Sequence, residues 1–245
     1  MSDFTWSGKN VLITGANRGI GLGMAKVIAA AGGSVIGAVR SSSEELDKLS
    51  GVRVITGIEM TDDDCGKKIT AALGDIKIDV VMANSGILQA SPMESMDYNS
   101  ARSMFDVNAL GPIKVVTDLA PLLKDDESKV FIMSSLMGSV SDCGSAMAAG
   151  YRMSKSAANM AGVCLSHLLK PRNITVQVSL VEGVIEAILV VACFMWSGSL
   201  DSSVVLLSYH VMPLASPIII ILISTLKHTY LYLCSCFTQG SSLRT

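Results

Sequence analysis

The sequence predicts an α/β fold in which a doubly wound parallel sheet carries helices on both faces. Three observations lead to this prediction: short apolar runs alternate with stretches of helical spacing, a glycine-rich turn follows the first run, and charged residues are spread as in a soluble protein up to about residue 182. Uninterrupted apolar strands are typical of parallel sheets that are buried on both faces. The 245 residues are enough for one large domain with a full core.

The predicted elements alternate along the chain. Six apolar runs are predicted as buried strands: Asn10–Thr14, Ser34–Val39, Val52–Ile58, Asp79–Ala83, Val130–Met133 and Thr175–Leu180. The stretches between them are predicted as helices because their apolar residues recur at helical spacing: Gly21–Ala31, Glu44–Leu49, Asp62–Leu73, Asn99–Leu123 and Tyr151–Leu169. Two glycines follow the first of these helices as a C-cap, and acidic residues lie in the first turn of the third.

Charge and cysteine usage exclude several classes of protein. The formal net charge of -2 gives no basic surface for nucleic acid. The six cysteines lack the spacing of a metal site, since Cys234 and Cys236 have no second pair nearby, so we expect no metal. The first ten residues carry no apolar run, which favours a cytoplasmic protein without a signal peptide. The sequence leaves open whether the chain forms a homo-oligomer.

A glycine-rich turn, Thr14-Gly-Ala-Asn-Arg-Gly-Ile-Gly21, joins the first strand to the first helix. Gly15 permits a tight turn, Gly19 lets the backbone approach a pyrophosphate, and Gly21 allows close packing of helix on strand. The helix N-terminus favours an anion through its free N–H groups and its dipole. The turn therefore predicts a dinucleotide site.

The end of the second strand indicates which dinucleotide is bound. An acid there would bind the ribose 2′-hydroxyl of NAD, but the strand ends in Ala38-Val-Arg40. Arg40, together with Arg18 of the glycine-rich turn, suits a 2′-phosphate, because a guanidinium binds phosphate through a bidentate fork. We therefore expect NADP (NADPH), with NAD as the less favoured cofactor.

The pair Tyr151 and Lys155 is the strongest chemical signal in the chain. Four residues apart on a helix, both side chains lie on one face. A nearby ammonium is expected to lower the pKa of the phenol and make it an acid–base group at working pH. Met133-Ser-Ser135 ends the fifth strand at the edge of the sheet where ligands bind, so Ser134 and Ser135 are both candidates to bind a substrate oxygen.

The spacing Gly-x-x-x-Gly-x-Gly, followed by Tyr-x-x-x-Lys, resembles the short-chain dehydrogenase/reductase family, which has a Rossmann-type fold. The stretches Ser134-Ser-Leu-Met-Gly-Ser-Val and Tyr151-Arg-Met-Ser-Lys-Ser-Ala-Ala-Asn-Met160 are most similar to a carbonyl-reductase-like branch that includes the C-factor and sniffer proteins. The resemblance covers about Lys9 to Glu182.

The resemblance implies roles for further residues. It selects Ser135 over Ser134 as the catalytic serine and implies that Asn108 anchors a water linked to Lys155. The catalytic set is therefore Asn108, Ser135, Tyr151 and Lys155. The implied cofactor contacts are Gly15, Asn17, Arg18, Gly19, Ile20, Gly21, Arg40, Glu59, Met60, Asn84, Ser85, Gly86, Tyr151 and Lys155. Ser85 departs from the alanine of the family's Asn-Ala-Gly motif.

The family pattern stops near residue 182, so we divide the chain into a Rossmann domain, 1–182, and an atypical hydrophobic tail, 183–245. Glu182-Gly183 replaces the family's Pro-Gly, and Ala187 replaces its hydroxyl residue. The C-terminal strand and the substrate loop are expected to be missing or replaced. Three interpretations of the tail stay open: a membrane anchor through 204–226, a buried replacement, or an aberrant splice or gene-model product.

The function implied by the resemblance is NADP-dependent interconversion of a small-molecule carbonyl compound and an alcohol. The alternative is a truncated, catalytically impaired dinucleotide-binding or regulatory protein, associated with a membrane through its tail. Without a seventh strand, the strand Thr175–Leu180 would be an exposed apolar edge, which predicts poor solubility and weak or no activity.

Overall fold

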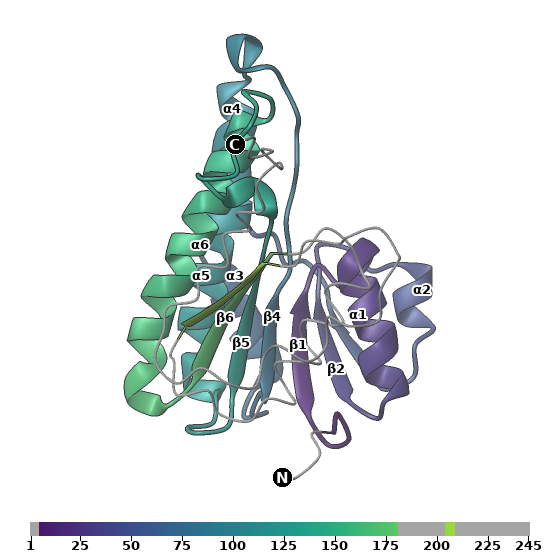
Figure 1. The fold of residues 1–245 in the computed structure, drawn as a ribbon. Helices are drawn as coiled ribbons and strands as arrows, with labels where there is room; N and C mark the ends of the chain where they lie inside the picture. Colours follow the sequence, from purple (N-terminus) through teal and green to yellow (C-terminus); the bar gives the residue numbers. More distant parts are fainter. Residues whose placement is uncertain (1–4, 181–203, 209–245) are drawn as a thin grey trace, which may run out of the picture.

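The described residues, 5–180 and 204–208, form a parallel sheet in the order β3-β2-β1-β4-β5-β6-β7 in this computed structural model (Figure 1). The strands are β1 Asn10–Thr14, β2 Ser34–Ala38, β3 Val52–Ile55, β4 Val80–Ala83, β5 Lys129–Ser134, β6 Thr175–Leu180 and β7 Val204–Ser208. The helices are α1 Gly19–Ala30, α2 Glu44–Asp47, α3 Cys65–Leu73, α4 Tyr98–Phe105, α5 Gly111–Leu119 and α6 Ala149–Leu169. The predicted fold class is therefore confirmed.

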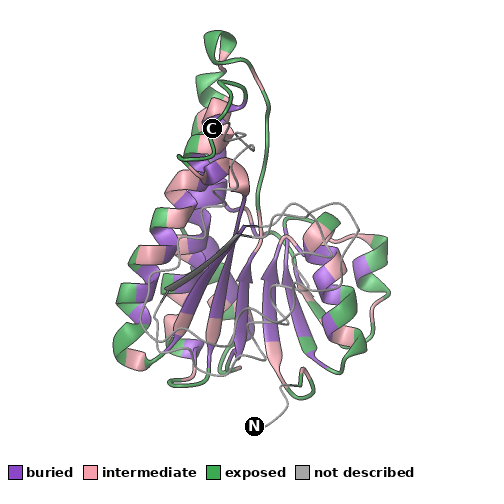
Figure 2. Cartoon of the chain, in the orientation of Figure 1, coloured by how far each residue is buried: buried purple, intermediate pink, exposed green. Residues whose placement is uncertain are grey.

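Apolar side chains alternate between the two faces of the central strands. Val11 and Phe131 belong to the core cluster on the side of α1 and α2, whereas Leu12 and Ile132 belong to the cluster packed by α3, α5 and α6. This is the two-residue period of a strand that is buried on both faces. Figure 2 shows the result: the central strands are largely buried, and the helices that flank them are buried mainly on the sides that face the sheet.

The strand order changes direction between β1 and β4. From β1 the chain proceeds to β2 and β3 on one side, and β4 then pairs on the other side of β1. In such sheets ligands bind at the carboxyl ends of the strands beside this switch point. The glycine-rich turn after β1 and the loops after β4 and β5 all leave the sheet at this edge. A 3-10 turn, η1 Met93–Ser95, and α4 rise beyond the same edge (Figure 1).

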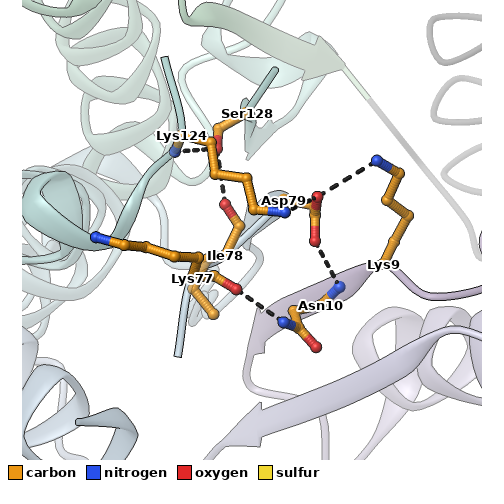
Figure 3. Close-up of polar contacts among 7 residues, drawn as sticks. All are labelled: Lys9, Asn10, Lys77, Ile78, Asp79, Lys124 and Ser128. Atoms are coloured by element: carbon orange, nitrogen blue, oxygen red, sulfur yellow. Dashed lines mark hydrogen bonds and ion pairs between the residues drawn. The ribbon is translucent and has the colours of Figure 1, made fainter. Parts of the chain in front are cut away.

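The opposite, amino-terminal edge is held by the buried carboxylate of Asp79 (Figure 3). It accepts hydrogen bonds from the ammonium groups of Lys124 (2.7 Å) and Lys9 (3.4 Å) and from the amide of Asn10 (2.9 Å). Nearby, the Ser128 hydroxyl donates to the Ile78 carbonyl oxygen at 2.7 Å. These contacts join the starts of β1, β4 and β5 at the edge of the sheet opposite the glycine-rich turn.

The helix predicted over 99–123 is interrupted. A π turn, η2 Asp106–Leu110, separates α4 from α5, and a 3-10 turn, η3 Ala120–Leu122, ends the segment. The π turn accommodates an additional residue, and such turns occur frequently at functional sites. Asn108 lies within it and is buried.

The sheet continues past β6, in contrast to the exposed edge predicted from the sequence. Val204–Ser208 pairs in parallel with β6, from Val176↔Val204 to Leu180↔Ser208. The strand belongs to the segment predicted as an atypical tail, so β6 is not the edge of the described sheet and its predicted exposure is wrong. The same five residues begin the candidate membrane span, 204–226; the rest of that span lies outside the described residues. Within the described ranges, no helix combines the length and apolarity needed to cross a membrane.

Candidate active site

The glycine-rich turn connects β1 to α1 as predicted. The Gly15 amide donates to the Ala38 carbonyl oxygen at 2.9 Å, and Arg18 precedes the helix in an extended conformation. Gly21 lies so close to the neighbouring chain that a Cβ atom there would contact the Gly15 carbonyl oxygen and lie 2.6 Å from Asn84 Nδ2. Gly21 is therefore required by close approach of the backbones, which is the role predicted from its position.

A hydroxyl that the sequence analysis missed joins this turn to β4. Thr14 Oγ1 accepts hydrogen bonds from the backbone amides of Asn84 and Ser85, each at 3.0 Å. The side chain of Asn84 donates in return to the Thr14 carbonyl oxygen at 3.0 Å. A buried Thr at the end of the first strand, together with an Asn directly after the fourth, is the signal that could have identified this contact.

The predicted 2′-phosphate contact Arg40 lies next to the predicted adenine contact Glu59. Arg40 Nη1 and Glu59 Oε2 are 3.4 Å apart, with the arginine side chain 78% exposed. Arg18 is also exposed, at the start of α1. Asn17 Nδ2 donates to the Ser41 carbonyl oxygen at 2.9 Å, which ties the glycine-rich turn to the segment after β2.

These residues fit a dinucleotide. The first turn of α1 contains no acidic side chain, so its N–H groups face the loop without a competing carboxylate. Gly19 has a φ of +53°, and nothing lies within 4 Å of the position its Cβ would take, which leaves space for a close backbone contact. Ile20 is half-buried in the same turn, and Met60 is buried. An anionic pyrophosphate is the group that such a helix start favours.

The catalytic candidates converge at the carboxyl end of β5. Ser135 is buried directly after this strand, and its side chain is hydrogen-bonded to the half-buried Tyr151 of α6. Lys155 is buried one helical turn later, with its ammonium nitrogen 5.8 Å from the centroid of the Tyr151 ring. The ammonium donates to the Met133 carbonyl oxygen at 2.8 Å. Ser134 points elsewhere, since its hydroxyl donates to Asn159 Oδ1 at 2.6 Å.

The ionisation of this pair differs from the sequence-based expectation. Burial raises the pKa of Tyr151, and the hydrogen bond with Ser135 only partly opposes this effect. Burial lowers the pKa of Lys155 to about 8. The expectation that the ammonium lowers the pKa of the phenol is therefore wrong for the chain without cofactor. The physical reason is that desolvation disfavours the charged form of both groups, and the ammonium lies beneath the ring, bonded to a carbonyl.

Asn108 connects the loop after β4 to α6. Its Oδ1 accepts from the Ile87 amide at 2.8 Å, and its Nδ2 donates to the Ile87 carbonyl oxygen and to Ser154 Oγ, each at 2.9 Å. The Ser154 hydroxyl donates to the Tyr151 carbonyl oxygen at 2.8 Å. A Cβ atom on Gly86 would lie 3.4 Å from Asn108 Oδ1 and 3.6 Å from Lys155 Nζ, so these three predicted residues are neighbours. The predicted water-anchoring role of Asn108 stays a prediction.

Comparison with known proteins agrees with this geometry. The family model of the short chain dehydrogenases matches residues 9–188. The chain belongs to the short-chain dehydrogenase family. A family member from Rhodococcus sp. (strain AD45), 1-hydroxy-2-glutathionyl-2-methyl-3-butene dehydrogenase, is 31% identical over 168 residues, which cover 68% of this chain and 74% of the relative. An oxidoreductase of Schizosaccharomyces pombe is 32% identical, but the match covers 64% of its length.

Solved structures of short-chain dehydrogenases share the fold. A short-chain dehydrogenase/reductase from Burkholderia multivorans with bound NADP is 26% identical, with a TM-score of 0.65 over 70% of this chain and 78% of that one. Sniffer, a carbonyl reductase of D. melanogaster, has a TM-score of 0.62 at 23% identity over 70% of this chain and 79% of its own. The predicted membership of the short-chain dehydrogenase/reductase family, with its class of oxidoreductase, is thus confirmed.

Proposed function

We propose that this chain is an NADP-dependent oxidoreductase that interconverts a small-molecule carbonyl compound and an alcohol. The observation that carries the proposal is the convergence of Ser135, Tyr151 and Lys155 at the carboxyl end of β5. Gly86, next to the ammonium of Lys155, belongs to the loop whose first residues contact Thr14 at the glycine-rich turn. A nucleotide held by that turn could therefore extend toward the Tyr151 hydroxyl.

The preference for NADP over NAD rests on charge. Two exposed guanidinium groups, of Arg18 and Arg40, flank the loop edge at which a 2′-phosphate would lie, and β2 ends without an acid. Guanidinium groups bind phosphate strongly. The bound NADP of the Burkholderia multivorans relative supports the same choice.

Bound NADPH would supply the hydride for reduction, and the residues of this chain would position the substrate and move the proton. Because the pKa of Tyr151 is raised, its phenol is protonated at neutral pH and can donate a proton to a carbonyl oxygen. The Ser135 hydroxyl, hydrogen-bonded to Tyr151, can bind the same oxygen and stabilise its developing charge. The ammonium of Lys155 would contact the nicotinamide ribose and favour loss of the Tyr151 proton once cofactor is bound.

The test is NADPH titration combined with a panel of aldehydes and ketones. We expect Tyr151→Phe to abolish NADPH oxidation while NADPH binding is nearly unchanged, because only the proton donor is removed. Lys155→Ala should weaken both turnover and binding. Turnover that survives Tyr151→Phe would contradict the proposed role of the phenol.

A second candidate function is dinucleotide binding without turnover. It is favoured by the loss of the family's Pro-Gly pair and hydroxyl residue, replaced by Glu182-Gly183 and Ala187. These positions, and the tail boundary proposed at residue 183, lie outside the described residues. The same titration separates the two candidates, because a chain that only binds the dinucleotide would bind NADPH and oxidise none of it with any member of the panel.

A further inference from the structure

The two consecutive serines at the end of β5 point to different partners. Ser135 is directed to Tyr151, while the hydroxyl of Ser134, buried to 4% exposure, donates to Asn159 Oδ1 at 2.6 Å. The residue just before the catalytic candidate is thus fixed to the middle of α6.

The turn just after Ser135 is fixed to the same side chain. In this 3-10 turn, η4 Leu136–Gly138, the carbonyl oxygen of Gly138 accepts from Asn159 Nδ2 at 3.3 Å and from Ser156 Oγ at 2.8 Å. The turn lies directly on the helix backbone, since a Cβ atom on Gly138 would come within 2.8 Å of the Lys155 carbonyl carbon. The amide of Asn159 therefore spans Ser135, with its oxygen holding the preceding residue and its nitrogen holding the end of the turn.

Asn159 is also in register with the catalytic candidates. It follows Lys155 by four residues and Tyr151 by eight, so all three side chains lie along one face of α6. We propose that Asn159 is a positioning residue that holds the segment from Ser134 to Gly138 so that the Ser135 hydroxyl meets Tyr151. This inference rests on the proposed function for its catalytic consequence and on the described contacts for its structural one.

The first test is a double-mutant cycle on the full chain, with kcat and NADPH Kd measured for each variant. Loss of the two hydrogen bonds should lower kcat about tenfold in Asn159→Ala, as expected for a misplaced oxygen-binding group. NADPH Kd should not change. In a Ser135→Ala background, the further change Asn159→Ala should have almost no effect, because the side chain that it positions is gone.

The second test needs no substrate. The Met137 amide donates to Ser135 Oγ at 3.2 Å and the Gly138 amide to the Ser135 carbonyl oxygen at 2.9 Å. Hydrogen exchange of both amides should be faster in Asn159→Ala. The matched control is Ser166→Ala, which removes a buried hydroxyl from the same helix that donates to the Val163 carbonyl oxygen at 2.7 Å. It should change neither kcat nor these two exchange rates.

Two results would overturn the proposal: unchanged exchange of the Met137 and Gly138 amides, or losses of kcat that multiply in the double variant. If the unmodified chain oxidised no NADPH with any carbonyl compound of the panel, that result would contradict the proposed function instead. The exchange comparison would then decide the inference about Asn159 by itself.

Discussion

The ammonium nitrogen of Lys155 donates a hydrogen bond of 2.8 Å to the carbonyl oxygen of Met133, and both residues are buried. This carbonyl is the last but one of β5, so the bond orients the ammonium at the level where Ser135 leaves the sheet. Burial lowers the pKa of Lys155 from 10.5 to about 8. At neutral pH the folded chain therefore holds a charge that water would solvate better, a difference of about 3 kcal/mol.

Lys155→Met should therefore make the protein more stable and inactive. We expect a gain of about 1–2 kcal/mol in the free energy of unfolding at pH 7, since removal of the desolvation cost exceeds the loss of one hydrogen bond. The sign of the pH dependence follows from the lowered pKa: between about pH 8 and 10.5 the folded chain binds fewer protons than the unfolded chain, so the stability of the unmodified protein should rise with pH there. Urea unfolding across this range checks both expectations.

The control for this prediction is Lys67→Met, which removes an exposed lysine. It should keep the rise in stability above pH 8 and leave NADPH turnover unchanged. If Lys155→Met also kept that rise, the buried ammonium would not be its source.

Cofactor selectivity should depend on the pair Arg40 and Glu59. Because the Glu59 carboxylate lies 3.4 Å from the Arg40 guanidinium, it would compete with the proposed 2′-phosphate for this charge. Arg40→Asp should weaken NADPH binding roughly tenfold or more, and reduce or invert the preference over NADH, as expected for loss of a charge-assisted phosphate contact. Glu59→Gln should raise the ratio of NADPH to NADH affinity by a few-fold.

Fluorescence titrations of both cofactors at two salt concentrations measure these effects, and the Arg40 contribution should decline as salt rises. Equal affinity of the unmodified chain for NADPH and NADH would contradict the proposed 2′-phosphate site.

Gly21→Ala should damage the dinucleotide site through the backbone. Its new methyl group would meet the Gly15 carbonyl oxygen and Asn84 Nδ2, so α1 would have to move away from the glycine-rich turn. We expect a loss of about 1–3 kcal/mol in stability, together with a loss of NADPH binding. Gly144→Ala is the matched control, because nothing lies within 4 Å of a Cβ atom there, and it should alter neither quantity. Normal NADPH affinity in Gly21→Ala would refute the role of this close approach.

Acid should weaken the amino-terminal edge of the sheet through Asp79 (Figure 3). Burial by itself would raise the pKa of Asp79, but the hydrogen bonds from Lys124 and the Asn10 amide and the charges of Lys124 and Lys9 outweigh it and lower the pKa. The contribution of this carboxylate to stability is therefore present above its unfolded pKa, about 3.9, and is lost as pH falls through the lower folded value.

Asp79→Asn should reduce the free energy of unfolding by about 1–3 kcal/mol at pH 7 and flatten its dependence on pH in the acid range. Asp125→Asn is the control: it removes an exposed carboxylate paired with Arg172 at 2.6 Å, so its effect should stay below about 1 kcal/mol. Equal losses in the two variants would show that burial of Asp79 gives it no special weight.

Much of the fold could be predicted because buried parallel strands are continuous apolar runs and the glycine-rich turn has fixed spacing. The choice between Ser134 and Ser135 could not be made from the pattern, since both lie where the same strand ends and only their partners on α6 separate them. The contact of Arg40 with Glu59 joins the ends of two different strands, which spacing along the chain does not reveal. The apolar run from Val204 could be a buried strand or a span, and periodicity does not distinguish them.

The π turn at Asp106–Leu110 changes the phase of a helix that is otherwise continuous. Each residue of an α-helix advances by about 100° around the axis, so one additional residue rotates everything after it by a comparable angle. The stripe of α4 that packs on α6 and the stripe of α5 that packs on α3 can thus point in different directions. The deletion of a single residue in this turn would place the two stripes on the same side of the helix. Either the packing of α5 on α3 or the packing of α4 on α6 would then be lost. The length of this segment, as much as the identity of Asn108, is therefore under structural constraint.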